Sequence, residues 1–252
     1  KAKDDVTEHF GTKFPQFFLT QPAPCPYLPG QQERKVFTKL GGQAARVLND
    51  SLTHFGFRRS QAIAYRPACE GCAACLSVRI LVDAFEPSRT MRRTIKRNRD
   101  LSGVIVDSIA TEDQFVLLRR YLDARHPGGG MSEMSVLDYV AMVEDTPVDT
   151  HLAEYRETSA DGNREGRLIA VTLTDVLSDG LSMVYSYYDP AEEDRSLGSF
   201  LILDHIEQAR ARRLPYVYLG YLVEGCRKMS YKAQYKPLEA YTADGWTAWP
   251  QR

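Results

Sequence analysis

The sequence predicts a mixed α/β (α+β) fold with a smaller N-terminal domain, residues 1–105, and a larger C-terminal domain, residues 106–252. The C-terminal part combines helical periodicity with runs of β-branched and aromatic residues, which is typical of helices packed on a sheet. The N-terminal part holds a cysteine loop between two short strand patterns. Hydrophobic residues are 43% of the 252 residues, enough for one large core or two smaller ones.

Charge and cysteine usage limit the partners and the compartment. The net charge is −1, so attraction to nucleic acid or to a membrane surface must be local. No apolar run reaches the roughly 18–20 residues of a membrane-spanning helix, and the N-terminus lacks the apolar core of a signal peptide. We therefore expect a cytoplasmic protein with reduced thiols, and the odd count of five cysteines suits a disulfide framework poorly.

The elements of the N-terminal part are predicted from local patterns. Residues 14–31 are rich in proline and are expected to be irregular, because proline fixes φ and removes backbone donors. Residues 34–56 place apolar side chains at helical spacing. Residues 63–67 and 75–85 alternate apolar and polar side chains or are β-branched, so they are predicted to form the two strands beside the cysteine loop.

The C-terminal part is predicted to contain three helices and a group of strands. Thr111 is a suitable N-cap for the first helix, and Asp179-Gly180 is a strong hairpin signal. The predicted helices cover residues 111–126, 136–145 and 197–213. The predicted strands cover residues 150–157, 167–177, 181–189 and 216–222, with a turn at 159–166 and a polar, aromatic tail after the last strand.

Three cysteines stand in the spacing C-x2-C-x2-C at Cys69, Cys72 and Cys75. This spacing is that of the first three ligands in one kind of iron–sulfur site, and Cys25, which precedes a proline, could supply a fourth thiolate. A tetrahedral zinc site needs the same four sulfurs. Packing of small thiols in a tight loop and redox switching are the alternatives. Nucleophilic catalysis is not expected, because no histidine lies nearby to activate a thiolate.

A basic segment and an R-x-x-G turn are candidate phosphate sites. Residues 88–101 carry six positive charges before the first acid, and Ser88 can cap a helix that gathers most of them on one face. The segment Arg195 to Gly198 opens a predicted helix, where free N–H groups can point at an anion. The alternatives are a solvated charge run for the first and an ordinary helix cap for the second.

Tyrosines and lysines interleave after residue 217, as in surfaces that stack bases and pair with phosphates. These residues are Tyr218, Tyr221, Lys228, Tyr231, Lys232, Tyr235 and Lys236. A tyrosine-rich core edge is the alternative. The chain has no phosphate-binding P-loop, no G-x-S-x-G and no H-E-x-x-H, which argues against three large enzyme classes.

Seven stretches together resemble the arginyl/leucyl-tRNA–protein transferase family, and in particular its bacterial branch, the aspartate/glutamate leucyltransferases. They follow the order of the family over most of the chain, from about residue 14 to 241. They read "PCPYLPGQ", "GFRRSQAIAYRPACEGCAACLSVRI", "RTMRRTIKRNRDL", "ARHPGGGM", "DGLSMVYSYYDP", "RSLGSFLILDHI" and "YLGYLVEGCRKMSYKAQYKPLE".

The resemblance implies a GNAT-like C-terminal domain that takes aminoacyl-tRNA in place of acyl-CoA, and an N-terminal domain that helps to read the acceptor. The implied reaction moves leucine from leucyl-tRNA to the N-terminal Asp or Glu of a protein and marks it for degradation. No cofactor is required for this step, because the donor ester is already activated and positioning can carry catalysis. Neither a membrane nor DNA is expected as a partner.

The resemblance also suggests roles for individual residues. An acidic N-terminus needs cationic recognition, for which the candidates are Arg58, Arg59, Ser60, Arg66 and Arg79. Candidates for binding tRNA and its aminoacyl end are Arg92, Arg93, Lys96, Arg97, Tyr185, Arg195, Ser196, Leu197, Gly198, Lys228, Tyr231 and Lys232. Asp189 and Tyr221 are candidates for handling the amine, with a buried salt bridge or a turn as the alternative for Asp189. Tyr221 is also a candidate for lining the aminoacyl pocket.

The cysteines depart from the pattern of the eukaryotic relatives, which carry C-x2-C in the first segment and a Cys-Cys pair in the second, linked to a metal or iron–sulfur centre. Here Leu28 replaces the second cysteine of the first pair. Cys25, Cys69, Cys72 and Cys75 remain, so a structural or regulatory zinc or iron–sulfur centre is an expectation with no inherited geometry.

Three questions stay open at this stage. Arginine remains an alternative donor, because Glu192, Glu193 and Asp194 adjoin the R-x-x-G turn and an arginine pocket should be acidic. An acetyl-CoA-dependent N-acetyltransferase would use the same fold. A non-catalytic module that binds tRNA or acidic N-termini would share the surfaces but show no turnover.

Overall fold

The computed structural model describes residues 14–128, 131–158 and 166–249. An eight-stranded mixed sheet forms its centre, in the order β14-β13-β7-β12-β11-β10-β9-β8. The strands are β7 (Cys75–Leu81), β8 (Leu101–Val106), β9 (Thr150–Glu157), β10 (Leu168–Val176), β11 (Gly180–Tyr188), β12 (Tyr216–Val223), β13 (Leu238–Thr242) and β14 (Gly245–Ala248). Four of them, β8 to β11, form an antiparallel meander.

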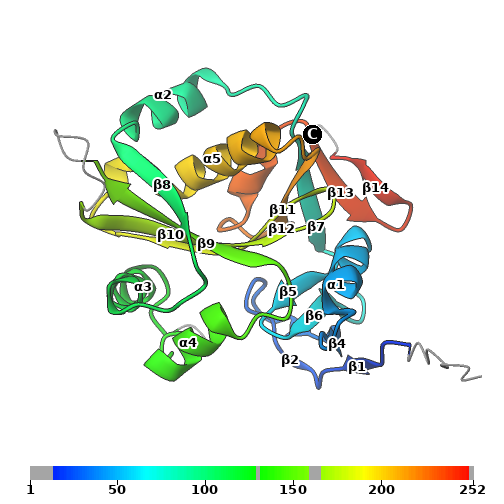
Figure 1. Ribbon diagram of the computed structural model, residues 1–252. Coiled ribbons are helices and arrows are strands. Elements are labelled where there is room, and N and C mark those ends of the chain that lie inside the picture. The colour runs from blue at the N-terminus through cyan, green and yellow to red at the C-terminus, as the bar shows by residue number, and fades with distance from the viewer. Residues whose placement is uncertain (1–13, 129–130, 159–165, 250–252) are drawn as a thin grey trace, which may run out of the picture.

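Helices cover both faces of this sheet (Figure 1). α2 (Arg89–Arg97) and α5 (Leu197–Ala211) lie on one face, and α3 (Glu112–Arg125) and α4 (Val136–Glu144) lie on the other. α5 connects β11 to β12, and this crossover makes β12 parallel to β11. An antiparallel meander followed by a helix and a parallel strand confirms the predicted mixed α/β fold with a GNAT-like C-terminal part.

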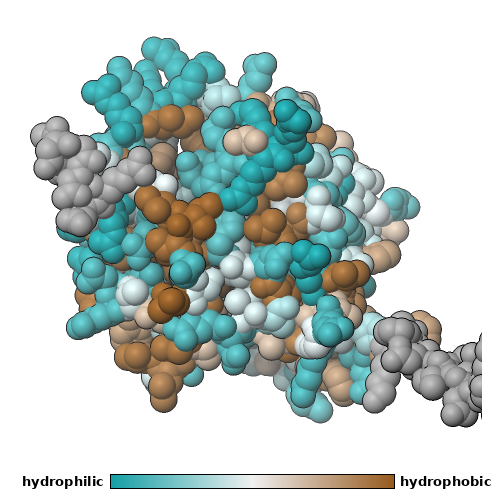
Figure 2. Space-filling view, in the orientation of Figure 1, coloured by the Kyte–Doolittle hydropathy of each residue, from teal (hydrophilic) through white to brown (hydrophobic). Residues whose placement is uncertain are grey.

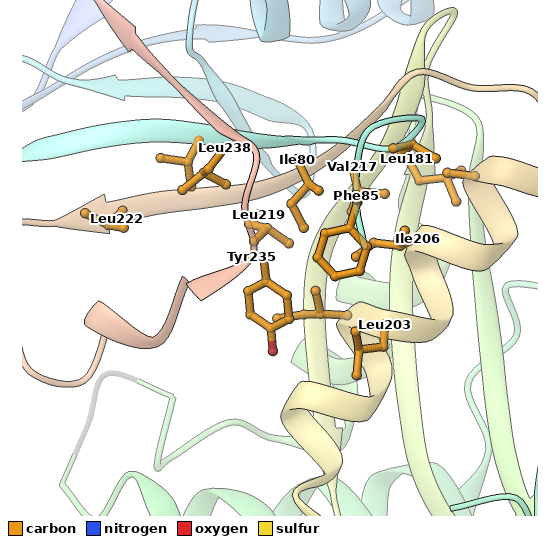
Figure 3. Close-up of a cluster of buried hydrophobic side chains, with 14 of the residues drawn as sticks. Ile80, Phe85, Leu181, Leu203, Ile206, Val217, Leu219, Leu222, Tyr235 and Leu238 are labelled. Atoms are coloured by element: carbon orange, nitrogen blue, oxygen red, sulfur yellow. The ribbon is translucent and has the colours of Figure 1, made fainter. Parts of the chain in front are cut away.

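The main core lies between α5 and the sheet. Figure 3 shows Leu203 and Ile206 of α5 facing Ile80, Val217 and Leu219 from the strands. Each fully buried aliphatic side chain of this kind contributes about 1.5–3 kcal/mol. β10, with the sequence LIAVTLTDV, is buried along almost its whole length, because helices cover both faces of the sheet.

The predicted helix starts are confirmed by their caps. The Ser88 hydroxyl accepts a hydrogen bond from the Met91 N–H, and Thr111 and Ser135 each form a reciprocal capping box. The hairpin at Asp179-Gly180 also forms, between β10 and β11. The turn predicted at 159–166 lies almost entirely outside the described residues. No helix in the described part of the chain is long and apolar enough to cross a bilayer.

A four-stranded sheet and one helix make up the N-terminal unit. Its strands are β1 (Phe17–Leu19), β4 (Lys35–Lys39), β6 (Ile63–Pro67) and β5 (Arg58–Ser60), and its helix is α1 (Ala45–His54). A small ribbon of β2 (Ala23–Pro24) and β3 (Gln32–Glu33) accompanies them. The helix predicted over 34–56 is therefore wrong in its first third, because β4 finds partner strands on both sides and Gly42 at φ +68° separates it from α1.

The predicted domain boundary at 105/106 falls within β8 and stays a prediction. β7, which the sequence assigned to the N-terminal part, is an inner strand of the large sheet and pairs with β12 and β13. The N-terminal unit thus ends after β6. The polar, aromatic tail also contributes β13 and β14. β7 and β13 pair with strands more than 100 residues away in sequence, and such partners leave no local pattern.

Candidate active site

The parallel strands β11 and β12 pair only at their first residues and then separate. The last aligned pair is Ser182 with Tyr218, after which β11 stays with β10 and β12 stays with β7. β12 shifts its register between Tyr218 and Gly220, and Gly220 has a φ of +81°, where glycine is strongly favoured. We call this opening the strand split. Its backbone groups need partners other than the neighbouring strand.

Arg58 of β5 fills the point where the strands separate. Its Nη1 donates to Ser182 Oγ at 3.3 Å, and its Nη2 donates to the Met183 carbonyl at 2.5 Å. A Cβ on Gly220 would come within 3.0–3.1 Å of this guanidinium, so the close approach requires glycine. Arg58 is 8% exposed. It faces the strand split, and its role with the acceptor stays a prediction.

Lys232 is a second buried cationic residue, and it binds the other strand of the split. It lies on a 3₁₀ helix, Ser230–Gln234, and its Nζ donates to the Tyr221 carbonyl of β12 at 2.7 Å. The residue is 7% exposed, and no salt bridge within the described residues includes it. Burial, and to a smaller extent Arg58, lowers the pKa of Lys232 to about 7. The amine points into the protein and not to the surface, and its predicted role with tRNA and its aminoacyl end stays a prediction.

Four tyrosines gather beyond the end of the split and form what we call the tyrosine wall: Tyr121, Tyr185, Tyr188 and Tyr231. The rings of Tyr121 and Tyr188 meet edge to face, with centroids 5.0 Å apart. Burial raises the pKa of Tyr121, and the nearby hydroxyls of Tyr188, Tyr185 and Tyr231 raise it further. Burial likewise raises the pKa of Tyr185 to about 12, so the hydroxyls are neutral. The predicted aminoacyl residues Tyr185 and Tyr231 thus come together.

The first turn of α5 adjoins this wall. A Cβ on Gly198 would lie 3.5 Å from the Tyr188 ring, and Ser196 precedes the helix in a left-handed conformation at φ +55°. The first N–H groups of a helix, here from Leu197 and Gly198, have no acceptor within it. They point along the axis toward the start of the helix, where the dipole favours negative charge. The two residues therefore stay candidates for an anion contact.

Arg195 is not free to bind phosphate. Its guanidinium donates to both oxygens of Asp100, at 2.9 and 2.8 Å, and to Glu192 at 2.8 Å. These bonds to carboxylates raise the pKa of Arg195 and occupy its donors. The prediction of a phosphate contact is therefore corrected: Arg195 ties the start of α5 to the chain before β8.

Asp189 has the alternative role that the sequence left open. It is 1% exposed, and its carboxylate accepts from Arg167 at 2.8 Å and from the Ala191 N–H at 3.1 Å. Arg120 lies 3.3 Å from the same carboxylate. Both oxygens are held in a salt bridge and a turn, which matches the alternative, and the catalytic role of Asp189 stays a prediction.

Two arginines predicted to read the acceptor are structural instead. Arg59 bonds both oxygens of Asp175 at 2.6 Å, and the two side chains are 1% and 2% exposed. Arg79 binds Glu239 at 2.7 Å and lies 3.6 Å from the centre of the Tyr216 ring. Neither guanidinium can meet a peptide carboxylate without breaking an internal ion pair.

The other two acceptor candidates keep accessible side chains. Ser60 is exposed. Arg66 donates to the Phe55 carbonyl at 3.0 Å and covers the Phe57 ring at 5.1 Å from its centre. No carboxylate of the described residues pairs with Arg66, so its role as an acceptor contact stays a prediction.

Tyr221 faces away from the tyrosine wall. Its hydroxyl lies 3.0 Å from the Tyr65 carbonyl and 3.2 Å from the Gly56 carbonyl, both in the N-terminal unit. Burial raises its pKa strongly. The phenol lies apart from the tyrosine wall, and its catalytic or aminoacyl-binding role stays a prediction. Tyr221 contributes to the split through its backbone carbonyl, which accepts from Lys232.

The four cysteines come together as expected, around a pocket of about 50 Å³ that Tyr221 also lines. The Leu28 N–H lies 3.4 Å from Cys25 Sγ, and the Arg34 N–H lies 3.5 Å from Cys69 Sγ. Burial and the three other thiols raise the pKa of Cys75 to about 11, because neighbouring thiolates repel one another without a cation.

The spacing of these sulfurs is wider than that of a closed zinc site. Within the described residues, the only group of three metal-ligand atoms less than 4.8 Å apart is Asp50, His54 and Asp179, so no three of the thiols are that close. Four sulfurs bound to one zinc ion at about 2.3 Å would be about 3.8 Å apart. The donor set and its N–H···S contacts suit a metal centre, whereas the distances do not by themselves match a single tetrahedral ion.

The basic face of α2 is exposed, as the sequence predicted. Arg92, Arg93, Lys96 and Arg97 all point to solvent, while Met91 and Thr94 pack toward α5. Figure 2 shows hydrophilic side chains over this part of the molecule. The Asn98 amide donates to the Arg195 carbonyl at 2.9 Å, so the end of α2 touches the start of α5. A phosphate backbone on this face would lie near that helix start.

Lys228 and His126 add positive charge near the wall. Lys228 is exposed. Burial, followed by the positive charges of Lys228 and Arg125, lowers the pKa of His126. The His126 and Tyr121 rings meet edge to face, with centroids 5.6 Å apart. Sequence reasoning missed Tyr121, Tyr188 and His126 as site residues, because no motif linked them to the other tyrosines.

The antiparallel meander, the α5 crossover and the strand split give this protein a GNAT-like architecture. The family models for arginine-tRNA-protein transferase match residues 23–93 with the N-terminal model and residues 113–242 with the C-terminal model. The chain therefore belongs to the arginine-tRNA-protein transferase family.

Curated relatives are similar along nearly the whole chain, and each is named aspartate/glutamate leucyltransferase. The protein of Methylobacterium sp. (strain 4-46) is 62% identical, over 92% of this chain and 95% of its own length. Those of Parvibaculum lavamentivorans and Afipia carboxidovorans are 58% and 57% identical, over 97% and 96% of this chain and 99% and 95% of their own lengths. Among solved structures, FemX has a TM-score of 0.45 at 9% identity, covering 67% of this chain and 58% of its own.

Proposed function

We propose that this protein transfers leucine from leucyl-tRNA to the α-amine of proteins that begin with Asp or Glu. The observation that carries the proposal is the 57–62% identity, over more than nine-tenths of the chain, to aspartate/glutamate leucyltransferases. An amide bond forms to the leucyl carbonyl, and the ester bond to the terminal ribose breaks. The ester is already activated, so the protein has to position two substrates and manage protons.

The surroundings of the tyrosine wall favour leucine over arginine as the donor. Glu192, the acid nearest the R-x-x-G turn, is bound by Arg167 at 2.5 Å and by Arg195 at 2.8 Å. Glu193 and Asp194 are exposed on the surface. A guanidinium would need a free carboxylate in the pocket, while an aliphatic side chain can pack against neutral aromatic rings. The acidic residues that had left arginine as an alternative donor are therefore paired with arginine side chains or exposed.

The partners that we propose are leucyl-tRNA and acidic N-termini, in the cytoplasm where charged tRNA is used. The exposed α2 face supports contacts to tRNA phosphates, because its cations lie close together and have few acidic partners. Arg58 supplies the positive character at the strand split that an acidic N-terminal residue requires.

A transfer assay tests the donor, the acceptor and the class of enzyme together. Purified protein is mixed with peptides that begin with Asp, Glu, Lys or Ala, and with either leucyl-tRNA or arginyl-tRNA. We expect the mass of one leucine to be added to the Asp and Glu peptides alone, as read by mass spectrometry. Addition of arginine would keep the family and overturn the donor. Binding of tRNA without any addition would instead indicate a non-catalytic module.

We further propose that Cys25, Cys69, Cys72 and Cys75 hold a zinc or iron–sulfur centre with a structural or regulatory role. The bound group would fix the cysteine loop against the N-terminal unit and would take no part in acyl transfer. We expect metal analysis of anaerobically purified protein to find zinc or iron, and Cys72→Ser to lose most of it. Cys226→Ser is the matched control, because this buried thiol does not line the pocket. Equal metal content in both variants would contradict the assignment.

A further inference from the structure

Lys232 combines three features that a structural lysine rarely has together. Its amine is buried, it has one hydrogen-bond acceptor, the Tyr221 carbonyl, and no carboxylate of the described residues pairs with it. An isolated buried ammonium is costly, so such a group tends to become neutral. A neutral amine that donates one N–H to a carbonyl keeps its lone pair free to accept a proton.

The charged and titratable groups around Lys232 favour that neutral form. Arg58 reaches toward it from β5, and this positive charge lowers the pKa of the amine further. From β12 the neighbour is Tyr221, whose own pKa burial raises, so the phenol is neutral. On the 3₁₀ helix itself, burial raises the pKa of Tyr231 to about 12 and also raises that of Tyr235. None of these groups supplies a negative charge near pH 7.

The position of Lys232 is suited to reacting groups. Its amine is anchored on β12 one residue past the glycine bulge of the strand split, and its neighbour Tyr231 belongs to the tyrosine wall. A cavity of about 530 Å³ borders the same 3₁₀ helix at Ser230 and Ala233, on either side of Lys232, whose own side chain does not line it. Space for a substrate chain therefore lies beside the segment that carries the amine.

We propose that the Lys232 amine is the general base and general acid of the transfer reaction, an inference that rests on the proposed function. The free α-amine of the acceptor attacks the leucyl carbonyl and forms the new C–N bond. Lys232 accepts the proton that the nitrogen must lose. The C–O bond to the ribose then breaks, and Lys232 returns the same proton to the ribose oxygen, so it ends the cycle neutral. The polar atoms of Asp189 and Tyr221 are instead held by Arg167 and by backbone carbonyls of the N-terminal unit.

The test compares Lys232→Arg and Lys232→Met with wild type in single-turnover leucine transfer to an Asp peptide. Arginine keeps a cation at the site but cannot act as a base near neutral pH. We expect both variants to lose about 10²–10⁴-fold in rate, the usual contribution of general acid–base catalysis, with unchanged affinity for leucyl-tRNA. Lys39→Met, an exposed lysine on β4, is the control and should stay within about twofold of wild type.

The pH profile separates a base from a residue that only supports the fold. The acceptor amine, with an unperturbed pKa of about 7.7–8.0, must be neutral to attack. If Lys232 must also be neutral, a plot of the logarithm of kcat/KM against pH for wild type should have a slope near 2 at pH values below the pKa of Lys232. The slope should fall to 1 in Lys232→Met. Added ethylamine should also restore transfer by Lys232→Ala in proportion to its free-base concentration, after correction for enzyme-free aminolysis.

The outcomes are distinguishable. A single-turnover rate of Lys232→Arg within about threefold of wild type would overturn the proposal. The proposal would also be overturned if the rate falls but the pH profile has the same slope in wild type and Lys232→Met, and ethylamine has no effect. Absence of any transfer by the wild-type protein would overturn the proposed function itself. The thermal midpoints of the arginine and methionine variants are measured first, and the folded one is used for the pH profile.

Discussion

Replacing Arg59 by methionine will lower the free energy of unfolding by about 3–5 kcal/mol. The guanidinium and the Asp175 carboxylate are almost completely buried and form two hydrogen bonds of 2.6 Å. Removing the arginine leaves a buried carboxylate without its cation, and the loss exceeds the value of the pair itself. Because Arg59 belongs to β5 and Asp175 to β10, the pair also holds the N-terminal unit on the large sheet.

Denaturant unfolding measures this effect, and the chain offers a matched control. Arg46 and Asp149 form another ion pair between the two parts, at 3.0 Å, but their side chains are 67% and 55% exposed. We expect Arg46→Met to cost less than about 1 kcal/mol. The double variant Arg59→Met/Asp175→Leu should recover most of the stability lost in the single one. An equal, small effect of Arg59→Met and Arg46→Met would show that burial does not set the strength of this pair.

Replacing Arg92, Arg93 and Lys96 together by glutamine will weaken tRNA binding by about 100-fold near 0.15 M salt. Each phosphate contact releases condensed counterions, and the logarithm of affinity falls with the logarithm of salt by about 0.7–0.9 for each contact. Three lost contacts should therefore reduce that slope by about 2–3. The three side chains point to solvent from α2, so the fold should be retained.

Titration of leucyl-tRNA at several salt concentrations tests this prediction. The control variant, Lys39→Gln/Arg46→Gln/Arg213→Gln, removes the same charge from exposed positions elsewhere. We expect the control to keep nearly the slope of wild type. Equal losses in both variants would mean that net charge, and not the α2 face, governs binding, and the predicted tRNA contacts there would be wrong.

Local patterns predicted most of the elements. Ser88, Thr111 and the Asp179-Gly180 pair set element ends through interactions that span only a few residues. The prediction of a helix at residues 35–39 was wrong. Local spacing favoured a helix there, but partner strands on both sides make the segment a strand. Strand identity depends on distant pairing, so the place of β7 in the large sheet and the tail strands were missed.

The candidate site was predicted unevenly. The exposed basic face of α2, the gathering of the four cysteines, and Tyr185 with Tyr231 in one aromatic cluster agree with expectation. The predictions for the arginines agreed less well with the structure. Residue type alone cannot distinguish an arginine that is free to bind a ligand from one that is already paired with an acid. Arg59, Arg79 and Arg195 are paired with acids 116, 160 and 95 residues away.

By itself the sequence determined the family, the class of fold, most helix and strand positions, and the solvent-facing basic helix, because these depend on composition, spacing and neighbours along the chain. Only the tertiary structure decided which charges are available. Lys232 is buried with no carboxylate partner among the described residues, whereas the two oxygens of Asp189 are held by Arg167 and by the Ala191 N–H. Desolvation and ion pairing depend on distances of a few ångströms between residues far apart in sequence, and those distances exist only after folding.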